Sequence, residues 1–115
     1  MAARIDAGAL VEAVVFDSPV RVADGLGGFD QGWQEQHRCR ARFVFSKGGE
    51  AIEAARLQGK SVFKLMIRQC AAARSIAPDW RVRDERRTLA YNVREVDTVT
   101  DRLWIYVLIE GGVAV

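Results

Sequence analysis

The clearest pattern in the chain is the alternation of apolar and polar residues in its last third. From residue 89 to 94 every second position is large and apolar, namely Leu89, Tyr91 and Val93. After a polar turn at residues 97–101 the same period returns at Leu103, Ile105, Val107 and Ile109. Such alternation predicts an antiparallel hairpin with one buried face. Because the second of these strands is apolar on its other face too, we expect it to be central or buried in a subunit contact.

A second alternating segment runs from Trp33 to Phe45. Its apolar face carries Cys39, Ala41, Phe43 and Phe45. Its polar face carries a row of three arginines, Arg38, Arg40 and Arg42, because successive side chains of a strand point to opposite faces. This row is either a solvated outer face or a surface that contacts acidic partners or nucleic acid.

Three further strands are predicted elsewhere in the chain. The first covers residues 11–16 and is expected to end or bend at Ser18-Pro19, because proline lacks the amide donor that a sheet needs. Another covers Val62–Gln69, with Phe63, Leu65 and Ile67 inward and Lys64, Met66 and Arg68 outward. A short strand is expected at Trp80–Arg83.

The segments between these strands are predicted to be loops and one short helix. Asp24–Gly32 is rich in glycine and lacks a phosphate-loop or dinucleotide motif, which favours a flexible hairpin loop. Glu50–Gln58 consists of strong helix formers, but at two to three turns it is marginal alone and must dock on something. Cys70–Pro78 is expected to be an irregular connector.

Together these elements predict one domain over residues 1–115. The fold class is mainly all-β: a small antiparallel β-barrel or sandwich of about six strands with one short helix. The chain of 115 residues is long enough to bury a modest core. Its N-terminus does not resemble a signal peptide, and the apolar run at residues 103–109 is too short to cross a bilayer. We therefore expect a soluble intracellular protein without a membrane partner.

Composition adds little that points to chemistry. The net charge of +2 implies no large electrostatic field. Nearly all basic residues are arginines, which reflects either GC-rich coding or the preference for arginine at interfaces and phosphate contacts. Cys39 and Cys70 lie outside any CxxC or Cys/His cluster, so free thiols and a reducing compartment are expected.

The residues offer no set that would support catalysis. His37 is the single histidine and has no ligand pattern around it, so we expect it at the edge of the core rather than at a metal. Asp84 and Glu85 lie in a turn flanked by arginines, which is typical of a solvated, ion-paired loop. The prediction is that the chain is not an enzyme and has no catalytic, cofactor, metal or small-molecule site.

Several short motifs occur in an order that resembles a known family. They are Ala7-Gly-Ala-Leu10, a Gly/Asp loop before Trp33, Ala41 in the next strand, Ser46-Lys-Gly-Gly-Glu50, Ile67-Arg68, Pro78-Asp-Trp-Arg-Val82 and the segment 89–96. Their order and spacing resemble the phage head–tail joining family, also called head–tail adaptor, head-closure or stopper proteins. Residues 70–75 depart from this resemblance, because they replace a short basic and glycine-containing loop.

The resemblance implies a structural virion protein of a tailed phage, a prophage or a gene transfer agent. Such a protein would be made in the cytoplasm of the bacterial host and would lie in the neck, at the head–tail interface. Copies would form a homo-oligomeric ring of six, with twelve as the alternative. This connector would lie between portal and adaptor proteins above and tail proteins below, close the filled head, dock the tail and surround passing DNA.

On this interpretation nine residues are candidates for the assembly interface. They are Arg38, Arg40 and Arg42 of the arginine row, Glu50, Glu53 and Arg56 of the predicted helix, Phe29 of the glycine-rich loop, and Trp104 and Tyr106 of the last strand. The helix and the loop are expected to become ordered only in the ring. Two alternatives remain. The chain is a small-barrel nucleic-acid-binding module that uses the arginines with exposed Trp104 and Tyr106, or it is another neck or tail component such as a tail terminator.

Overall fold

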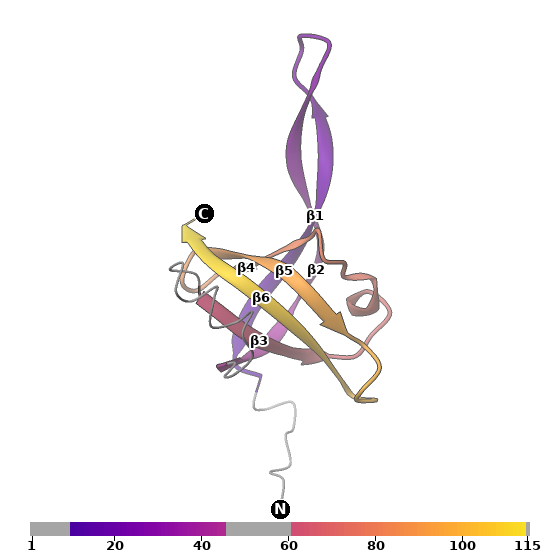
Figure 1. The fold of residues 1–115 in the computed structure, drawn as a ribbon, viewed down its shortest axis with the longest axis vertical. Coiled ribbons are helices and arrows are strands. Elements are labelled where there is room, and N and C mark those ends of the chain that lie inside the picture. The colour runs from indigo at the N-terminus through magenta and orange to yellow at the C-terminus, as the bar shows by residue number, and fades with distance from the viewer. Residues whose placement is uncertain (1–9, 46–60, 115) are drawn as a thin grey trace, which may run out of the picture.

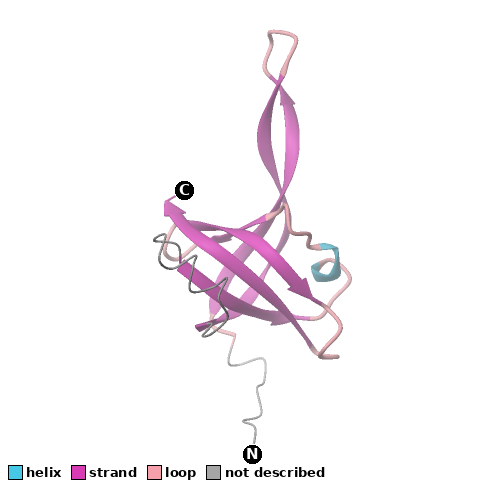
Figure 2. Ribbon diagram, viewed as in Figure 1, coloured by secondary structure: helices cyan, strands magenta, loops and turns pink. Residues whose placement is uncertain are grey.

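Six antiparallel strands close into a barrel in the order β1-β2-β3-β6-β5-β4 (Figures 1 and 2). The structure is a computed structural model that describes residues 10–45 and 61–114. The strands are β1 (Glu12–Ala23), β2 (Phe29–Phe45), β3 (Ser61–Arg68), β4 (Arg81–Asp84), β5 (Leu89–Asp97) and β6 (Trp104–Ala114). A 3-10 turn, η2 (Ala73–Ser75), lies in the connector between β3 and β4. The all-β barrel expected from the alternation is confirmed.

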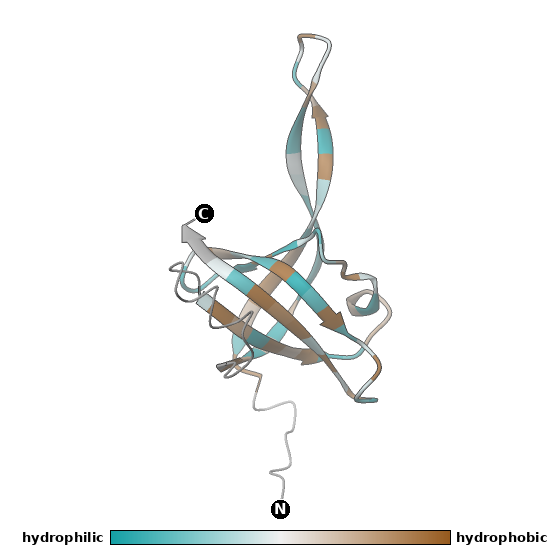
Figure 3. Ribbon diagram, viewed as in Figure 1, coloured by the Kyte–Doolittle hydropathy of each residue, from teal (hydrophilic) through white to brown (hydrophobic). Residues whose placement is uncertain are grey.

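The core of the barrel is formed by the inward faces of the strands. The largest cluster of buried apolar side chains includes Val14, Phe16, Leu65, Ile67, Val82, Val93, Ile105, Val107 and Ile109. Figure 3 shows alternating apolar and polar bands along β5 and a mostly apolar β6. Each fully buried side chain of this size contributes about 1.5–3 kcal/mol. The inward positions predicted for β3 and β6 are therefore confirmed, with the exception of Leu103, which precedes β6 and is exposed.

The outer face of the barrel carries a second, smaller buried cluster. Leu10, which precedes β1, packs together with Met66 of β3 and Trp104 of β6, and Tyr106 lies against them. Met66 thus points outward as predicted, yet it is buried. This covering explains why β6 is apolar on both faces, and β6 also pairs with a strand on each side, β3 and β5.

The strand β1 is longer than predicted, because it continues through Pro19 to Ala23. Up to Asp17 this strand pairs with β2 on one side and β4 on the other, but beyond Asp17 it pairs with β2 alone. Proline is tolerated in a strand that has a free edge. Of the two outcomes predicted for Ser18-Pro19, an end or a bend, the end is therefore wrong, and the register irregularity lies just before it, between Phe16 and Asp17. The predicted loop Asp24–Gly32 is also shorter, since β2 already begins at Phe29.

The outer parts of β1 and β2 form a two-stranded ribbon that projects from the barrel (Figure 1). We call residues 18–34 the arm. Phe16 pairs with His37 but Asp17 pairs with Glu35, so Gln36 is an extra residue in β2. Such a β-bulge bends a strand and increases its twist, and here it lies where the ribbon leaves the barrel. The arm contributes to an elongated molecule of 60 × 35 × 26 Å.

Two of the sequence predictions concern other parts of the chain. The helix predicted at Glu50–Gln58 lies outside the described residues. The irregular connector predicted at Cys70–Pro78 is confirmed, with η2 as its only regular turn. Within the described ranges, no helix is long and apolar enough to cross a membrane.

Candidate assembly interface

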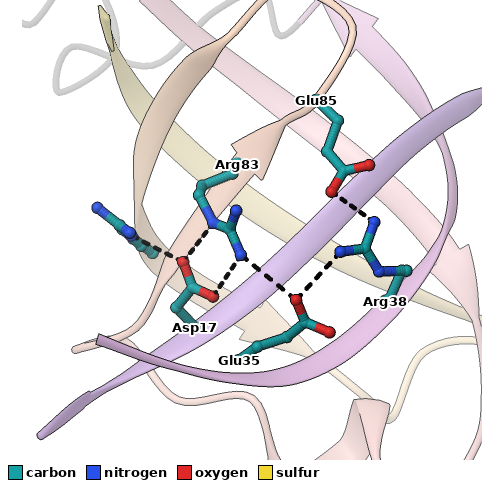
Figure 4. Close-up of polar contacts among 6 residues, drawn as sticks. Asp17, Glu35, Arg38, Arg83 and Glu85 are labelled. Atoms are coloured by element: carbon teal, nitrogen blue, oxygen red, sulfur yellow. Dashed lines mark hydrogen bonds and ion pairs between the residues drawn. The ribbon is translucent and has the colours of Figure 1, made fainter. Parts of the chain in front are cut away.

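The base of the arm is fixed by a buried carboxylate, Asp17 of β1, which is only 1% exposed. Arg83 of β4 holds it with two hydrogen bonds, from Nε to Oδ2 at 2.6 Å and from Nη2 to Oδ1 at 3.0 Å. Arg81 donates a third, from Nε to Oδ2 at 2.8 Å. Both arginines reach the same carboxylate because they are two residues apart on one strand and so share its outer face. Figure 4 shows this arrangement.

The electrostatics of this group favour its charged form. Burial alone raises the pKa of the Asp17 carboxyl, but the hydrogen bonds from Arg83 and Arg81 and their positive charges outweigh burial, so the pKa is lowered overall. The pKa of Arg83 is raised, chiefly by its hydrogen bonds to Asp17. Asp17 is therefore ionised at neutral pH and is paired with two cations.

Further charged residues extend these contacts across the base of the arm. Glu35 Oε1 lies 3.6 Å from Arg83 Nη2 and 3.1 Å from Arg38 Nη2, and Arg38 also bonds Glu85 in the β4–β5 turn (Figure 4). In addition, the guanidinium of Arg81 lies 4.7 Å from the centre of the Trp33 ring. We call the six charged residues the junction network: Asp17, Glu35, Arg38, Arg81, Arg83 and Glu85. It joins β1 and β2, at the base of the arm, to β4.

A second group of charges holds the β4–β5 turn beside this network. Asp84 is buried, and its Oδ1 accepts hydrogen bonds from the backbone N–H groups of Arg86 and Arg87. The Arg87 guanidinium donates to Asp84 Oδ2 at 2.8 Å and to Glu12 of β1 at 3.1 Å. The hydrogen bond to Asp84, followed by the one to Glu12, raises the pKa of Arg87. The ion-paired turn predicted from sequence is thus present, although Asp84 itself is not solvated.

The far part of the arm exposes large apolar side chains. Val22, Leu26 and Phe29 are 50%, 91% and 61% exposed, and the Arg21 guanidinium lies 4.9 Å from the centre of the Phe29 ring. The tip is nevertheless well defined, since Asp24 Oδ1 accepts hydrogen bonds from Leu26 N and Gly28 N. A two-stranded ribbon is at best marginally stable alone in water, and this one exposes apolar residues on both of its faces.

The arginine row has the orientation that the alternation predicts. Arg38, Arg40 and Arg42 are all exposed on the outer face of β2. Arg38 belongs to the junction network, which the sequence did not indicate. Arg40 and Arg42 form no ion pair with any described residue. The row therefore divides into one structural residue and two arginines that are available for a partner.

The remaining candidates have different outcomes. Phe29 is exposed on the arm. Trp104 is buried against Leu10 and Met66, so the expectation that it is exposed was wrong, and Tyr106 is half-buried with the Lys64 amine 5.8 Å from its ring centre. Glu50, Glu53 and Arg56 lie outside the described residues. Sequence reasoning missed Asp17, whose signal was a carboxylate directly after the apolar run 14–16.

His37 lies at the edge of the core, as predicted. Its ring is stacked on Phe16 with the ring centres 6.4 Å apart, and burial lowers its pKa. Cys70 Sγ lies 3.8 Å from His37 Nε2. Both cysteines are free thiols, and burial, with a smaller effect of Cys70, raises the pKa of Cys39 to about 12. No cluster of His, Cys, Asp and Glu suited to a metal ion occurs in the part of the chain that the structure describes.

Comparison with known proteins identifies a family and similar solved structures. The family model described as phage head completion protein matches residues 5–112. A chain of the virion of a native gene transfer agent particle is 25% identical, with 92% of this chain and 97% of that chain covered and a TM-score of 0.60. The solution structure of protein SF1141 from Shigella flexneri 2a is 15% identical, with 94% and 97% covered and a TM-score of 0.66. No curated protein matches the chain.

Proposed function

Because this chain belongs to the phage head completion protein family, a family of structural virion proteins of the head–tail neck, we propose that copies of it form a ring there. The ring lies between portal or adaptor proteins and tail proteins, closes the DNA-filled head and docks the tail. The observation that carries the proposal is the family match over residues 5–112. The likeness to a gene transfer agent virion chain over 92% of this chain supports it.

Two features of the structure support the assembly role. The arm carries exposed apolar side chains on a ribbon that the barrel does not stabilise along its length. The junction network holds the base of that ribbon at a fixed place on the barrel. A contact surface on a preorganised element loses less conformational entropy when it binds. Six copies remain the proposed number, with twelve as the alternative.

The decisive experiment is electron microscopy of particles from a strain that lacks this gene. Heads that are filled or leaking DNA, beside free and complete tails, are expected. Intact infectious particles from that strain would exclude the joining role. Restoring the wild-type gene provides the control.

A second variant separates folding from joining. Ser18 and Gln34 face each other across the two strands, so an Asn-Gly turn between them replaces residues 19–33 with a connection that suits a two-residue hairpin. This armless chain is expected to keep the cooperative unfolding of the barrel but to fail to restore joined particles. Normal joining by the armless chain would show that the arm has no part in the neck.

The alternative function, binding of nucleic acid, is favoured by one observation. Arg40 and Arg42 are exposed on β2, and Lys64 and Tyr106 lie together on the outer faces of β3 and β6. Basic and aromatic groups on one barrel face are typical of single-strand binding. A gel-shift titration tests it, because phosphate contacts must weaken steeply as salt concentration rises. If no salt-sensitive shift is observed, nucleic-acid binding is refuted, and Arg40 and Arg42 are assigned to contact with a protein partner.

A further inference from the structure

Exposed apolar side chains gather at two places on the described part of the molecule. Five of its seven strongly exposed large apolar residues fall into two groups, and the other two, Val11 and Val44, stand singly. One group is the arm patch, Val22, Leu26 and Phe29 at the far end of the arm, where Val22 pairs with Asp30 and Phe29 with Ala23, so that Val22 and Phe29 lie on opposite faces of the ribbon. The other is the turn patch, Val99 and Leu103, in the turn between β5 and β6. Figure 1 shows the arm and this turn at opposite ends of the molecule.

The turn patch lies on a rigid support. Asp97 Oδ1 accepts hydrogen bonds from Val99 N and Thr100 N, both at 3.0 Å, and Asp101 Oδ1 accepts one from Leu103 N at 2.8 Å. Gln69, which lies outside the turn, also stabilises it: its Nε2 donates hydrogen bonds to the carbonyl oxygens of residues 98 and 101 at 2.9 and 3.0 Å. Val99 is nevertheless 89% exposed. A turn held this firmly presents an apolar surface that is already shaped for a partner.

We infer that the arm patch of one copy packs against the turn patch of the next copy in the ring. This inference rests on the proposed function. A ring of identical chains requires a heterologous contact, in which two different surfaces of the same chain meet. The arm patch and the turn patch are the two apolar groups that the described residues offer for such a contact, and their location at opposite ends lets each copy contact two neighbours.

Charge also supports this pairing. Asp30 lies on the arm and Arg102 in the turn, and both are exposed without an ion-pair partner among the described residues. Arm against turn brings these opposite charges together at the edge of the apolar contact.

Cross-linking inside assembled particles tests the inference. Two differently tagged chains, Leu26→Cys and Leu103→Cys, are produced together, and particles are purified, mildly oxidised and resolved without reductant. A disulfide-linked pair containing both tags is expected. Wild-type chains and the pair Leu26→Cys with Asp79→Cys, whose second site is exposed in the β3–β4 connector, serve as controls and are expected to give no such pair.

Charge exchange provides a second measurement on the same particles. Asp30→Arg or Arg102→Asp alone is expected to lower the yield of the cross-linked pair about fivefold or more, and the two together should restore it. Chains present in particles without the cross-link, a Leu26→Cys homodimer, or a link from the arm to another neck protein would each overturn the inference. Absence of the chain from particles would instead refute the proposed function.

Discussion

The buried position of Asp17 gives the sharpest prediction about stability. In the variant Asp17→Asn the side chain keeps its size but loses its charge, so Arg81 and Arg83 lose the carboxylate that both of them bind. Removing one partner of a buried ion pair typically costs about 3–5 kcal/mol. The two arginine side chains remain 23% and 26% exposed, so water replaces part of the lost interaction. We therefore expect a loss at the low end of that range, about 3 kcal/mol at neutral pH.

Urea unfolding followed by tryptophan fluorescence measures this loss. With a slope of about 1.5–2 kcal/mol/M, the midpoint should fall by about 1.5–2 M while the slope stays constant. Asp79→Asn removes an exposed carboxylate in the β3–β4 connector and is the matched control, with an unchanged midpoint. If Asp17→Asn unfolded at the same urea concentration as the control, the buried network could not be what holds the base of the arm.

The pH dependence of the same pair of proteins provides an independent check. The pKa of Asp17 is lowered from its ordinary value of 3.8 in the folded chain. A carboxyl of this kind contributes stability above the unfolded-state pKa, and the contribution is lost as pH falls through the folded-state pKa. The difference between wild type and Asp17→Asn should therefore be full at neutral pH and shrink once the pH drops below 3.8. A difference that stayed constant at low pH would assign the effect to packing rather than to charge.

Three further predictions concern other parts of the chain. Gly111 has a φ of 130° beside a register shift, so Gly111→Ala should destabilise by about 1–3 kcal/mol in urea. Gly32→Ala should cost less, because Gly32 does not have a positive φ, although its new methyl group would lie 2.7 Å from Val22 Cγ2 and 3.4 Å from Val20 Cγ2, so both side chains must shift. Since burial raises the pKa of Cys39 to about 12, peptide mapping should find it unalkylated at about pH 8 in the folded chain and alkylated in urea. Arg40→Glu with Arg42→Glu should reduce incorporation into particles without changing the thermal unfolding temperature, and normal incorporation would remove these arginines from the interface.

The sequence was most informative where one physical rule decided the outcome. Period-two alternation placed β2, β3, β5 and β6 correctly, because inward residues such as Leu65 of β3 and Val107 of β6 must leave water whatever the topology. The same rule failed at Leu103, where the pattern continues into a turn. In that turn Asp101 Oδ1 accepts a hydrogen bond from Leu103 N, and Gln69 Nε2 donates one to the backbone oxygen of Asp101. Alternation reports which side of a strand faces the core, but it does not report where pairing stops.

The projecting arm could not be predicted for the same reason. Whether Pro19 ends a strand depends on the strand beside it. Pairing of β1 with β4 stops at Asp17, which pairs with Arg81. Because Arg81 is far away in the chain, the sequence around Pro19 does not report this. The bulge at Gln36 cannot be recognised from the sequence of apolar and polar residues around it. Trp104 lies on the outer face of β6, where alternation predicts exposure, but Leu10 from the other end of the chain covers it.

The ionic character of the junction follows from the location of the arm. An element that leaves the barrel has no core of its own to bury, so apolar contacts at its base would have to be made on the outer face of β1, β2 and β4. Directed hydrogen bonds from two arginines to one carboxylate fix the position of Asp17, and Glu35 and Arg38 extend that constraint to the opposite strand. Buried ion pairs add little net stability compared with apolar packing. Their contribution here is to orient the arm. A variant that replaces the junction network with apolar residues should therefore fold but hold the arm in more than one orientation. Its yield of joined particles should fall, whereas its urea midpoint should not.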